Sequence, residues 1–339
     1  MKKILVVLTG GTIGSEIQAH QILPGPVDRV ALVERYRAST AARTEVDFTC
    51  IRPMNSLSEN MTPADWTRLI EAIRARNLAE YSGIIIAHGT DTLAFSAAAV
   101  AYCFARCPLP VLLVASDYPL ADVRANGLEN FICAVDFIVT HPVAGVFVPY
   151  RNQHQYMLVH VGTRLASSPQ LSGDFFSVRE TPYARFVDGD FQIMNPLPEV
   201  AEHDIEPVKP VFSERVMLIR PYPGLDYSRL DLKGVDAVLH DLYHSGTACA
   251  APLAGGRYAL TDFIDRCRAR NIAVFLAPAL KSPAHYQSTE SLLTKGAEMI
   301  WNISLEAAYV KLLLAYGNYD DEARIKAFLA RDLAFEHVS

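Results

Sequence analysis

The first strand that the sequence predicts ends in a turn rich in glycine and hydroxyl groups. Thr9 to Gly14 reads Thr-Gly-Gly-Thr-Ile-Gly and follows the aliphatic run Ile4–Leu8. Glycine lets the backbone fold tightly, so Thr12 can project its hydroxyl while neighbouring amides remain available to stabilise an oxyanion. Such a turn could instead cradle a dinucleotide or a phosphate, but its spacing differs from G-x-G-x-x-G, and no acidic residue closes a second strand in the usual place. We therefore predict Thr12 as a candidate nucleophile.

A second polar turn follows another aliphatic run. His88-Gly-Thr-Asp-Thr92 comes directly after Gly83–Ala87. A carboxylate at the end of a buried strand costs free energy unless a cation or a hydrogen-bond donor binds it. The ammonium of a free amino acid would meet that need at Asp91. We therefore predict that Thr90 and Asp91 form the second part of a site for a small amino acid.

Two more turns carry polar side chains that could join this site. Ser58 and Glu59 precede a predicted helix and could contact the carboxylate and the ammonium of an amino acid; taken alone, they fit ordinary helix-start residues better. Ala115-Ser-Asp117 follows a strand predicted at Pro110–Val114. Because the carboxyl ends of parallel strands meet at one edge of a sheet, we expect the turns after the predicted strands to converge on one crevice.

Helix-like stretches separate these strands. Thr62 begins one of them, with Pro63 at its first position and Asp65 at its third, and the pattern runs to about Ala79. The alanine-rich stretch from Thr92 to Arg106 is another. Strands that alternate with helices predict an α/β fold whose mostly parallel sheet is covered by helices on both faces.

The chain is predicted to have two domains. Residues 1–191 form a larger N-terminal domain that carries the polar turns, and 192–213 form a proline-bearing linker. Residues 214–339 form a smaller C-terminal α/β domain. Its strands are predicted near 216–219, 237–239 and 272–276, and its helices near 261–270 and 305–315.

Composition narrows the class of protein. The net charge is near −6 with both signs interspersed, so the chain lacks the basic stripe that a nucleic-acid partner requires. No apolar run approaches the length of a membrane span, and the N-terminal run is too short for a signal peptide. The six cysteines contain no Cys-x-x-Cys pair and are interpreted as buried or free thiols. These features predict a cytoplasmic protein with no membrane and no nucleic-acid partner.

The turns together resemble the signature motifs of the bacterial-type L-asparaginase and glutaminase-asparaginase family. The resemblance covers most of the chain, and its motifs occur in the same order and at similar spacing. The matching segments are Thr9–Gly14, Ser58–Pro63, His88–Thr92, Pro119–Arg124 and Leu305–Leu312.

This resemblance implies an activity and a role for each matching residue. It implies hydrolysis of the side-chain amide of asparagine to aspartate and ammonia, without a metal or a cofactor. Thr12 would be the nucleophile that forms an acyl-enzyme, and Thr90 with Asp91 would belong to the second catalytic group. Ser58, Glu59 and Asp91 would hold the α-groups of the amino-acid amide substrate.

The resemblance also implies an assembly. Members of the family have a larger N-terminal and a smaller C-terminal domain, and their active sites form between the subunits of a homodimer or homotetramer. The polar residues of Tyr243-His-Ser-Gly-Thr247 could reach the site of a neighbouring subunit.

The sequence departs from the family at one catalytic position. A lysine beyond the Thr-Asp turn normally completes a triad, but no lysine occurs between Lys3 and Lys209. Arg164 lies near the expected region and could orient a carboxylate, yet a guanidinium stays protonated and cannot act as a base. His154 or His160 could take the proton, although a lone histidine on such a segment is more often structural.

Three functions therefore remain open at the level of sequence. The first is a hydrolase of asparagine or of a related amide that uses Thr12. The second is a catalytically weak relative that binds a small amino acid through Ser58, Glu59 and Asp91, which the missing lysine favours. The third, a nucleotide-dependent enzyme, has the least support. The preferred amide, its stereochemistry and any regulation are not set by the sequence alone.

Overall fold

The computed structural model of the protein describes residues 1–11, 13, 15–18, 21–24, 31–198, 207–251 and 256–338. The chain forms two compact units. One comprises Met1–Pro210 together with Leu333–Phe335, and the other comprises Val211–Asp332 together with Glu336–Ser339. The predicted α/β class and two-domain organisation are confirmed. The division falls after Pro210, and the stretch 199–206 of the predicted linker lies outside the described residues.

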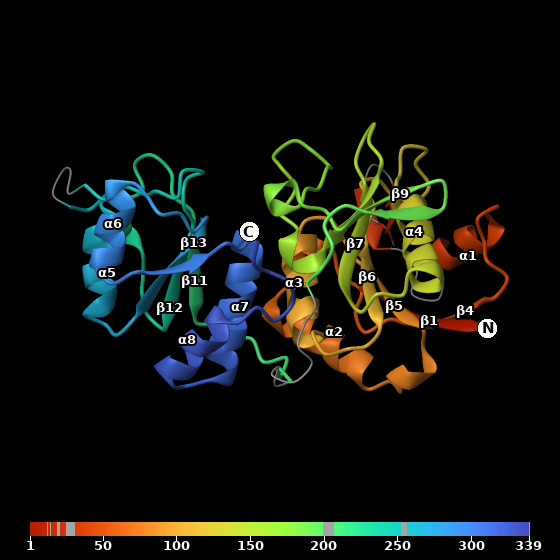
Figure 1. Ribbon diagram of the computed structural model, residues 1–339, viewed down its shortest axis with the longest axis horizontal. Coiled ribbons are helices and arrows are strands. Elements are labelled where there is room, and N and C mark those ends of the chain that lie inside the picture. The colour runs from red at the N-terminus through yellow and green to blue at the C-terminus, as the bar shows by residue number, and fades with distance from the viewer. Residues whose placement is uncertain are drawn as a thin grey trace. The chain divides into compact units, whose positions relative to one another are not determined.

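The larger unit is built on one mixed eight-stranded sheet (Figure 1), with the order β10-β9-β8-β7-β6-β5-β1-β4. The strands from β4 to β7 along this order run parallel, whereas β8, β9 and β10 are added antiparallel. The strands are β1 (Lys2–Leu8), β4 (Val46–Ile51), β5 (Gly83–Ala87), β6 (Pro110–Val114), β7 (Gly145–Arg151), β8 (Met157–Val161), β9 (Ala184–Val187) and β10 (Asp190–Ile193).

Helices cover both faces of this sheet (Figure 1). Side chains alternate between the faces of a strand, so Ile4 and Val6 of β1 point to the same side. They share a core with α1 (Ala31–Ala38) and α4 (Gly127–Thr140). The opposite face carries α2 (Pro63–Arg74) and α3 (Leu93–Cys103), which are joined by a 2.9 Å hydrogen bond from the Trp66 indole to the Ser96 hydroxyl.

The start of α2 follows the capping chemistry that the sequence predicts. Asp65 accepts hydrogen bonds from both the backbone N–H and the hydroxyl of Thr62, and Pro63 occupies the first helical position. The helix nevertheless ends at Arg74 and does not reach Ala79. The Arg74 guanidinium donates to the Cys103 carbonyl, and the chain then leaves the helix axis through a short 3-10 turn at Leu78–Glu80.

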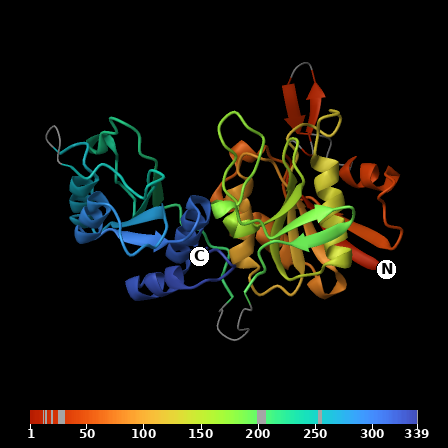
Figure 2. The same cartoon turned by 45° about the horizontal axis from the view of Figure 1, so that its top comes forward.

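A small antiparallel ribbon follows the first turn. It consists of β2 (Ser15–Gln18) and β3 (Gln21–Pro24), and Figure 2 shows it in red, standing apart from the large sheet. Residues 25–30, which separate this ribbon from α1, lie outside the described residues.

The smaller unit has a fully parallel four-stranded sheet with the order β11-β12-β13-β14. Its strands are β11 (Val216–Ile219), β12 (Ala237–His240), β13 (Ala273–Ala279) and β14 (Glu298–Trp301). Its helices are α5 (Leu260–Arg268), α6 (Gln287–Thr294), α7 (Leu305–Asn318) and α8 (Glu322–Ala330). Across the described parts of both units, no helix is both long and apolar enough to cross a membrane. All six cysteines are free thiols, as predicted.

A buried ion pair fixes the C-terminal segment within the smaller unit. The Lys311 ammonium on α7 lies 2.6 Å from the Glu336 carboxylate, and both side chains are fully buried. The same ammonium donates to the carbonyls of Leu329 and Arg331. The charge of Lys311 is therefore met by oxygen atoms from a single stretch of chain at the end of the sequence.

Removing the Glu336 carboxylate should destabilise the smaller unit strongly. Glu336→Ala leaves the Lys311 ammonium buried without its counter-charge, which costs about 3–5 kcal/mol. Urea unfolding in a Trp66→Phe background measures this loss, because Trp301 of the smaller unit is then the remaining tryptophan. Asp265→Ala, also in the smaller unit, breaks the exposed pair with Lys295 and serves as the control, with a much smaller change expected. Equal changes for the two variants would contradict the role given to the buried pair.

Candidate active site

The first glycine turn is hydrogen-bonded to the segments on either side of it. Thr9 donates its hydroxyl to the Ala87 carbonyl at 2.9 Å, which ties the end of β1 to the end of β5. On the other side, Ser56 donates its N–H to Thr9 and accepts one from Gly11, at 2.9 and 3.0 Å. The turns that follow β1, β4 and β5 are thus held together through backbone groups.

These turns meet with no space for a side chain between them. Gly11 has a φ of +76°, and a Cβ on it would lie 2.5 Å from the backbone nitrogen of Gly89. A Cβ on Gly89 would in turn lie 2.5 Å from the Ser58 hydroxyl oxygen. The glycines of both sequence motifs are therefore required because the backbones approach each other closely.

The close approach brings Ser58 and Asp91 together. Ser58 is buried in a 3-10 turn (Ser58–Asn60), and its hydroxyl donates to Asp91 Oδ2 at 2.7 Å. The Asp91 backbone N–H donates back to the same hydroxyl at 3.2 Å, and the Thr92 hydroxyl donates to the Ser58 carbonyl at 2.9 Å. Ser58 is thus fixed against the turn after β5 by three hydrogen bonds.

Polar groups beside this pair face no partner within the described part of the chain. No described residue bonds to Asp91 Oδ1 or to the half-buried Thr90 hydroxyl. Glu59, the next residue after Ser58, has an exposed side chain and no hydrogen bond to a described residue. Thr12, the predicted nucleophile, lies outside the described residues.

His88 belongs to the same turn and was given no role by the sequence. It is fully buried, its Nδ1 lies 2.7 Å from the Gly89 carbonyl, and its Nε2 has no partner among the described residues. Burial lowers the pKa of its imidazole, so the ring is neutral at physiological pH. The signal in the sequence was its position directly after a buried strand.

Arg164 lies in a 3-10 turn (Gly162–Arg164) that follows β8 and packs on α3. Its Nε donates to the Phe335 carbonyl at 2.6 Å, and the neighbouring Thr163 donates its hydroxyl to Ala334 at 2.8 Å. A Cβ on Gly162 would lie 3.3 Å from the Ala97 carbonyl, which places this turn beside the first half of α3. The C-terminal segment therefore holds the turn that carries Arg164.

The two histidines considered as proton acceptors differ in their surroundings. His154 is exposed in the turn after β7 and has a positive φ of 56°. His160 on β8 is buried, with its Nδ1 2.8 Å from the Ser177 hydroxyl. Burial lowers the pKa of His160 to about 4, so this imidazole binds a proton poorly near neutral pH.

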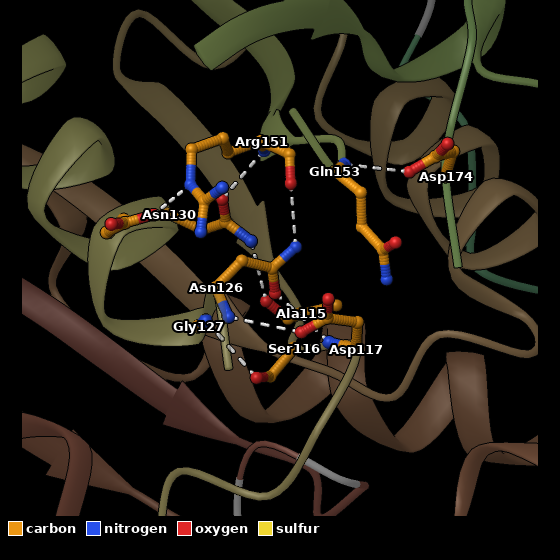
Figure 3. Close-up of polar contacts among 10 residues, drawn as sticks. Ala115, Ser116, Asp117, Asn126, Gly127, Asn130, Arg151, Gln153 and Asp174 are labelled. Atoms are coloured by element: carbon orange, nitrogen blue, oxygen red, sulfur yellow. Dashed lines mark hydrogen bonds and ion pairs between the residues drawn. The ribbon is translucent and has the colours of Figure 1, made fainter. Parts of the chain in front are cut away.

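A fourth turn, after β6, is organised around a carboxylate (Figure 3). Asp117 Oδ1 accepts the backbone N–H groups of Tyr118 and Asn126 at 2.9 and 3.1 Å. The Asn126 side chain also binds Asp117, because its Oδ1 accepts a hydrogen bond from the Asp117 backbone N–H at 3.0 Å. The sequence placed this turn at the same edge of the sheet but gave its side chains no role.

Comparison with known proteins decides the family. The sequence model described as "Asparaginase, N-terminal" matches residues 3–198, which is more than half of the chain. The protein belongs to the asparaginase family. The family resemblance carried by the motifs is thereby confirmed, and an amide bond is the type of bond on which members of this family act.

Solved asparaginases share the fold over the whole chain. The thermostable L-asparaginase from Thermococcus kodakarensis has a TM-score of 0.81 at 23% identity, with 99% of each chain covered. L-asparaginase I from Vibrio cholerae has a TM-score of 0.79 at 24% identity, covering 100% of this chain and 99% of its own. At such identities the likeness establishes the asparaginase fold and leaves the substrate open.

Curated relatives carry a different name. A glutamyl-tRNA(Gln) amidotransferase subunit from Thermoplasma acidophilum is 28% identical over 329 residues, covering 94% of this chain and 76% of that protein. The protein of the same name from Methanococcus maripaludis is 28% identical over 356 residues, covering 99% of this chain and 81% of that protein.

Within the described residues of this asparaginase-family chain, no cluster of histidine, cysteine and acidic side chains could hold a metal ion.

Adding a methyl group where the two glycine turns touch should push them apart. Gly11→Ala adds both a strained φ and an overlap with the Gly89 backbone. Gly189→Ala is the matched control, because Gly189 also has a positive φ, of 86°, but nothing lies within 4 Å of its added Cβ. We expect the control to lose about 1–2 kcal/mol from strain alone. Gly11→Ala should lose about 1–3 kcal/mol more from the overlap. Calorimetry of both variants measures the difference, and equal losses would show that the turns can relax apart.

Proposed function

We propose that this protein hydrolyses the side-chain amide of asparagine to aspartate and ammonia, with Thr12 as the nucleophile. The observation that carries the proposal is the Ser58–Asp91 contact at the meeting point of three turns, beside donors and acceptors that no described residue uses. Such an arrangement suits a small zwitterion better than an internal structural role. Family membership supports the reaction type.

The α-groups of the substrate would be bound at the Ser58–Asp91 pair. Asp91 Oδ1 offers a carboxylate oxygen to the α-ammonium, and the exposed Glu59 carboxylate lies next in the chain to Ser58. The backbone N–H groups of Ser58 and Glu59 bond no acceptor in the described part of the chain, so they can donate to the α-carboxylate. Carboxylates that bind the α-ammonium and backbone N–H groups that bind the α-carboxylate would together fix the orientation of the substrate.

The chemical steps follow acyl transfer. The Thr12 oxygen attacks the amide carbon, and the proton of its hydroxyl passes to the departing nitrogen as ammonia leaves. The backbone N–H groups of Gly89 and Thr90 bond no acceptor among the described residues and are candidate donors to the oxyanion. Water then hydrolyses the ester and releases aspartate. Thr90 and Asp91 would position the second proton transfer.

The missing lysine predicts a slow enzyme. In the family a lysine normally completes the group with Thr90 and Asp91, and here Arg164 is the basic residue near the expected region. A guanidinium does not lose its proton, and the low pKa of His160 makes that ring a poor base. A positioned acid-base group contributes about a hundred- to ten-thousandfold in rate, so its loss would lower kcat.

The remaining properties follow from the proposed activity. We propose a homodimer or homotetramer that acts in the cytoplasm on a small amino-acid amide, requires no cofactor and binds neither nucleic acid nor membranes. Site contributions from Tyr243–Thr247 of a neighbouring subunit belong to the same proposal. Sedimentation velocity tests the assembly directly.

The names of the curated relatives favour a second candidate. This chain could be one component of an amidotransferase and release ammonia that another protein uses. It would then show low ammonia release alone and a higher rate with its partner. A third candidate, binding of an amino acid without turnover, predicts thermal stabilisation by asparagine or aspartate and no ammonia.

Substitution of the nucleophile tests the proposal. Thr12→Ala should abolish ammonia release from asparagine, because the oxygen that attacks the amide is absent, while the melting temperature stays within a few degrees of the parent. Thr12→Ser, which keeps a hydroxyl, is the control and should retain measurable turnover. Release of ammonia by Thr12→Ala at the parent rate would refute the role of Thr12.

Placing a lysine near the region where the family has one tests whether the missing lysine limits the rate. Arg164→Lys supplies an amine that can exchange a proton, so kcat with asparagine should rise by about tenfold or more. Arg164→Met removes the charge and the proton donor and is the control. An unchanged kcat in Arg164→Lys would show that the base, if one acts, comes from elsewhere.

A further inference from the structure

The turn after β6 places a carboxylate next to the turn that carries Thr90. Ala87 of β5 pairs with Val114 of β6, and the backbone bond from His88 N–H to the Val114 carbonyl, at 2.8 Å, extends this pairing to the strand end. Asp117 follows Val114 by three residues, as Thr90 follows Ala87. The two side chains therefore come from turns that leave neighbouring strands at paired residues, each three positions beyond the strand end.

Asp117 is held rigidly before any ligand binds. Its Oδ1 accepts two backbone N–H groups, from Tyr118 and Asn126, and its own N–H is bound by the Asn126 side chain. The Ser116 hydroxyl closes the turn by donating to the Tyr118 carbonyl. Figure 3 shows the Asp117 and Asn126 side chains pointing toward each other. A side chain fixed in this way binds a ligand without a further loss of its own conformational freedom.

The second oxygen of this carboxylate has no partner among the described residues. None of them donates to Asp117 Oδ2, and the nearby cations are engaged elsewhere, since Arg151 pairs with Glu129 and Arg124 pairs with Asp122. Burial raises the pKa of Asp117, whereas the backbone N–H groups and the charge of Arg151 lower it. A half-buried carboxylate oxygen to which no described side chain bonds is costly, which points to a cation or a donor that the ligand supplies.

The sheet order indicates which part of a substrate would reach Asp117. β6 lies on one side of β5, whereas β1 and β4 lie on the other. Ser58, which follows β4, contacts Asp91, so the proposed α-group contacts lie on the β4 side of β5. Neighbouring strands are about 4.8 Å apart. A group that leaves the amide on the side away from Ser58 therefore meets the turn after β6.

We propose that Asp117 is a specificity-determining residue that binds a positively charged leaving group, so that the preferred substrates are side-chain amides of aspartate formed with a diamine or a similar aminoalkyl amine. This inference rests on the proposed function. Gln153, from the turn after β7, extends its side chain toward the same region and offers an additional amide (Figure 3).

The reaction stays balanced with such a substrate. The Thr12 oxygen forms a bond to the amide carbon, the carbon–nitrogen bond breaks, and the diamine leaves with the proton of the Thr12 hydroxyl. Water then cleaves the ester and releases aspartate. Water is the only co-reactant, and no group changes its oxidation state.

Two substrates that differ in the charge of the leaving group test the proposed contact with Asp117. N4-(2-aminoethyl)-L-asparagine carries a terminal ammonium, and N4-propyl-L-asparagine replaces it with a methyl group of similar size. Aspartate release gives kcat/KM for each. In the parent enzyme the charged substrate should be preferred by about tenfold or more, as expected for a hydrogen bond between charged groups. Asp117→Asn keeps an oxygen that can accept the two backbone N–H groups and should bring the ratio close to one.

A neighbouring carboxylate provides the control. Asp122 lies in the same turn, and both of its oxygens accept hydrogen bonds from Arg124. Asp122→Asn removes the same charge and should leave the preference unchanged. A preference that survives in Asp117→Asn, or that is absent in the parent, would overturn the inference, since Asp117 would then serve only to hold its turn.

Failure of the Asp117 inference can be distinguished from failure of the proposed hydrolase activity. If asparagine and both analogues yield no aspartate, the hydrolase proposal fails, and thermal stabilisation by the two analogues then tests Asp117 alone. Greater stabilisation by the aminoethyl compound in the parent, lost in Asp117→Asn, would still support the charge contact. Equal stabilisation of both proteins by both compounds would overturn it.

Discussion

The backbones of two glycine turns touch at the carboxyl edge of the large sheet, and the candidate site depends on this contact. Gly11 cannot carry a side chain because the Gly89 backbone lies against it, and Gly89 cannot carry one because Ser58 lies against it. The contact brings the turn after β5 against Ser58 and gives Asp91 its fixed neighbour. A difference of a single methyl group would therefore act on several polar groups at once, because they share one rigid junction.

Charged side chains have different partners at two places in the structure. In the smaller unit, Lys311 and Glu336 neutralise each other completely in the interior. At the edge of the large sheet, the carboxylates of Asp91 and Asp117 are met by a hydroxyl and by backbone N–H groups, with no basic side chain bonded to either among the described residues. Neutral donors orient a carboxylate and leave its charge in place. The interior pair serves stability, and the edge retains the electrostatic potential that a cationic substrate would require.

The sequence predicted those features that depend on local patterns. The bounds of β5 and β6 agree with the continuous aliphatic runs, and the start of α2 agrees with the capping residues around Thr62. The convergence of the turns followed from the parallel order of strands. The end of α2 at Arg74 was not predicted, because it is accompanied by a hydrogen bond to Cys103, a tertiary contact that no local pattern reveals. The same applies to the role of Asp117, since its partner Asn126 is recognisable only once the turn has folded.

The C-terminal segment contributes to the unit in which the chain begins. Ala334 and Phe335 accept hydrogen bonds from Thr163 and Arg164, which lie 171 residues earlier. During synthesis, most of the large sheet leaves the ribosome well before these last residues do. The segment that supports Arg164 is therefore the last part of its unit to be made, so that a ribosome-bound or truncated chain would carry a nearly complete sheet while this support was still absent.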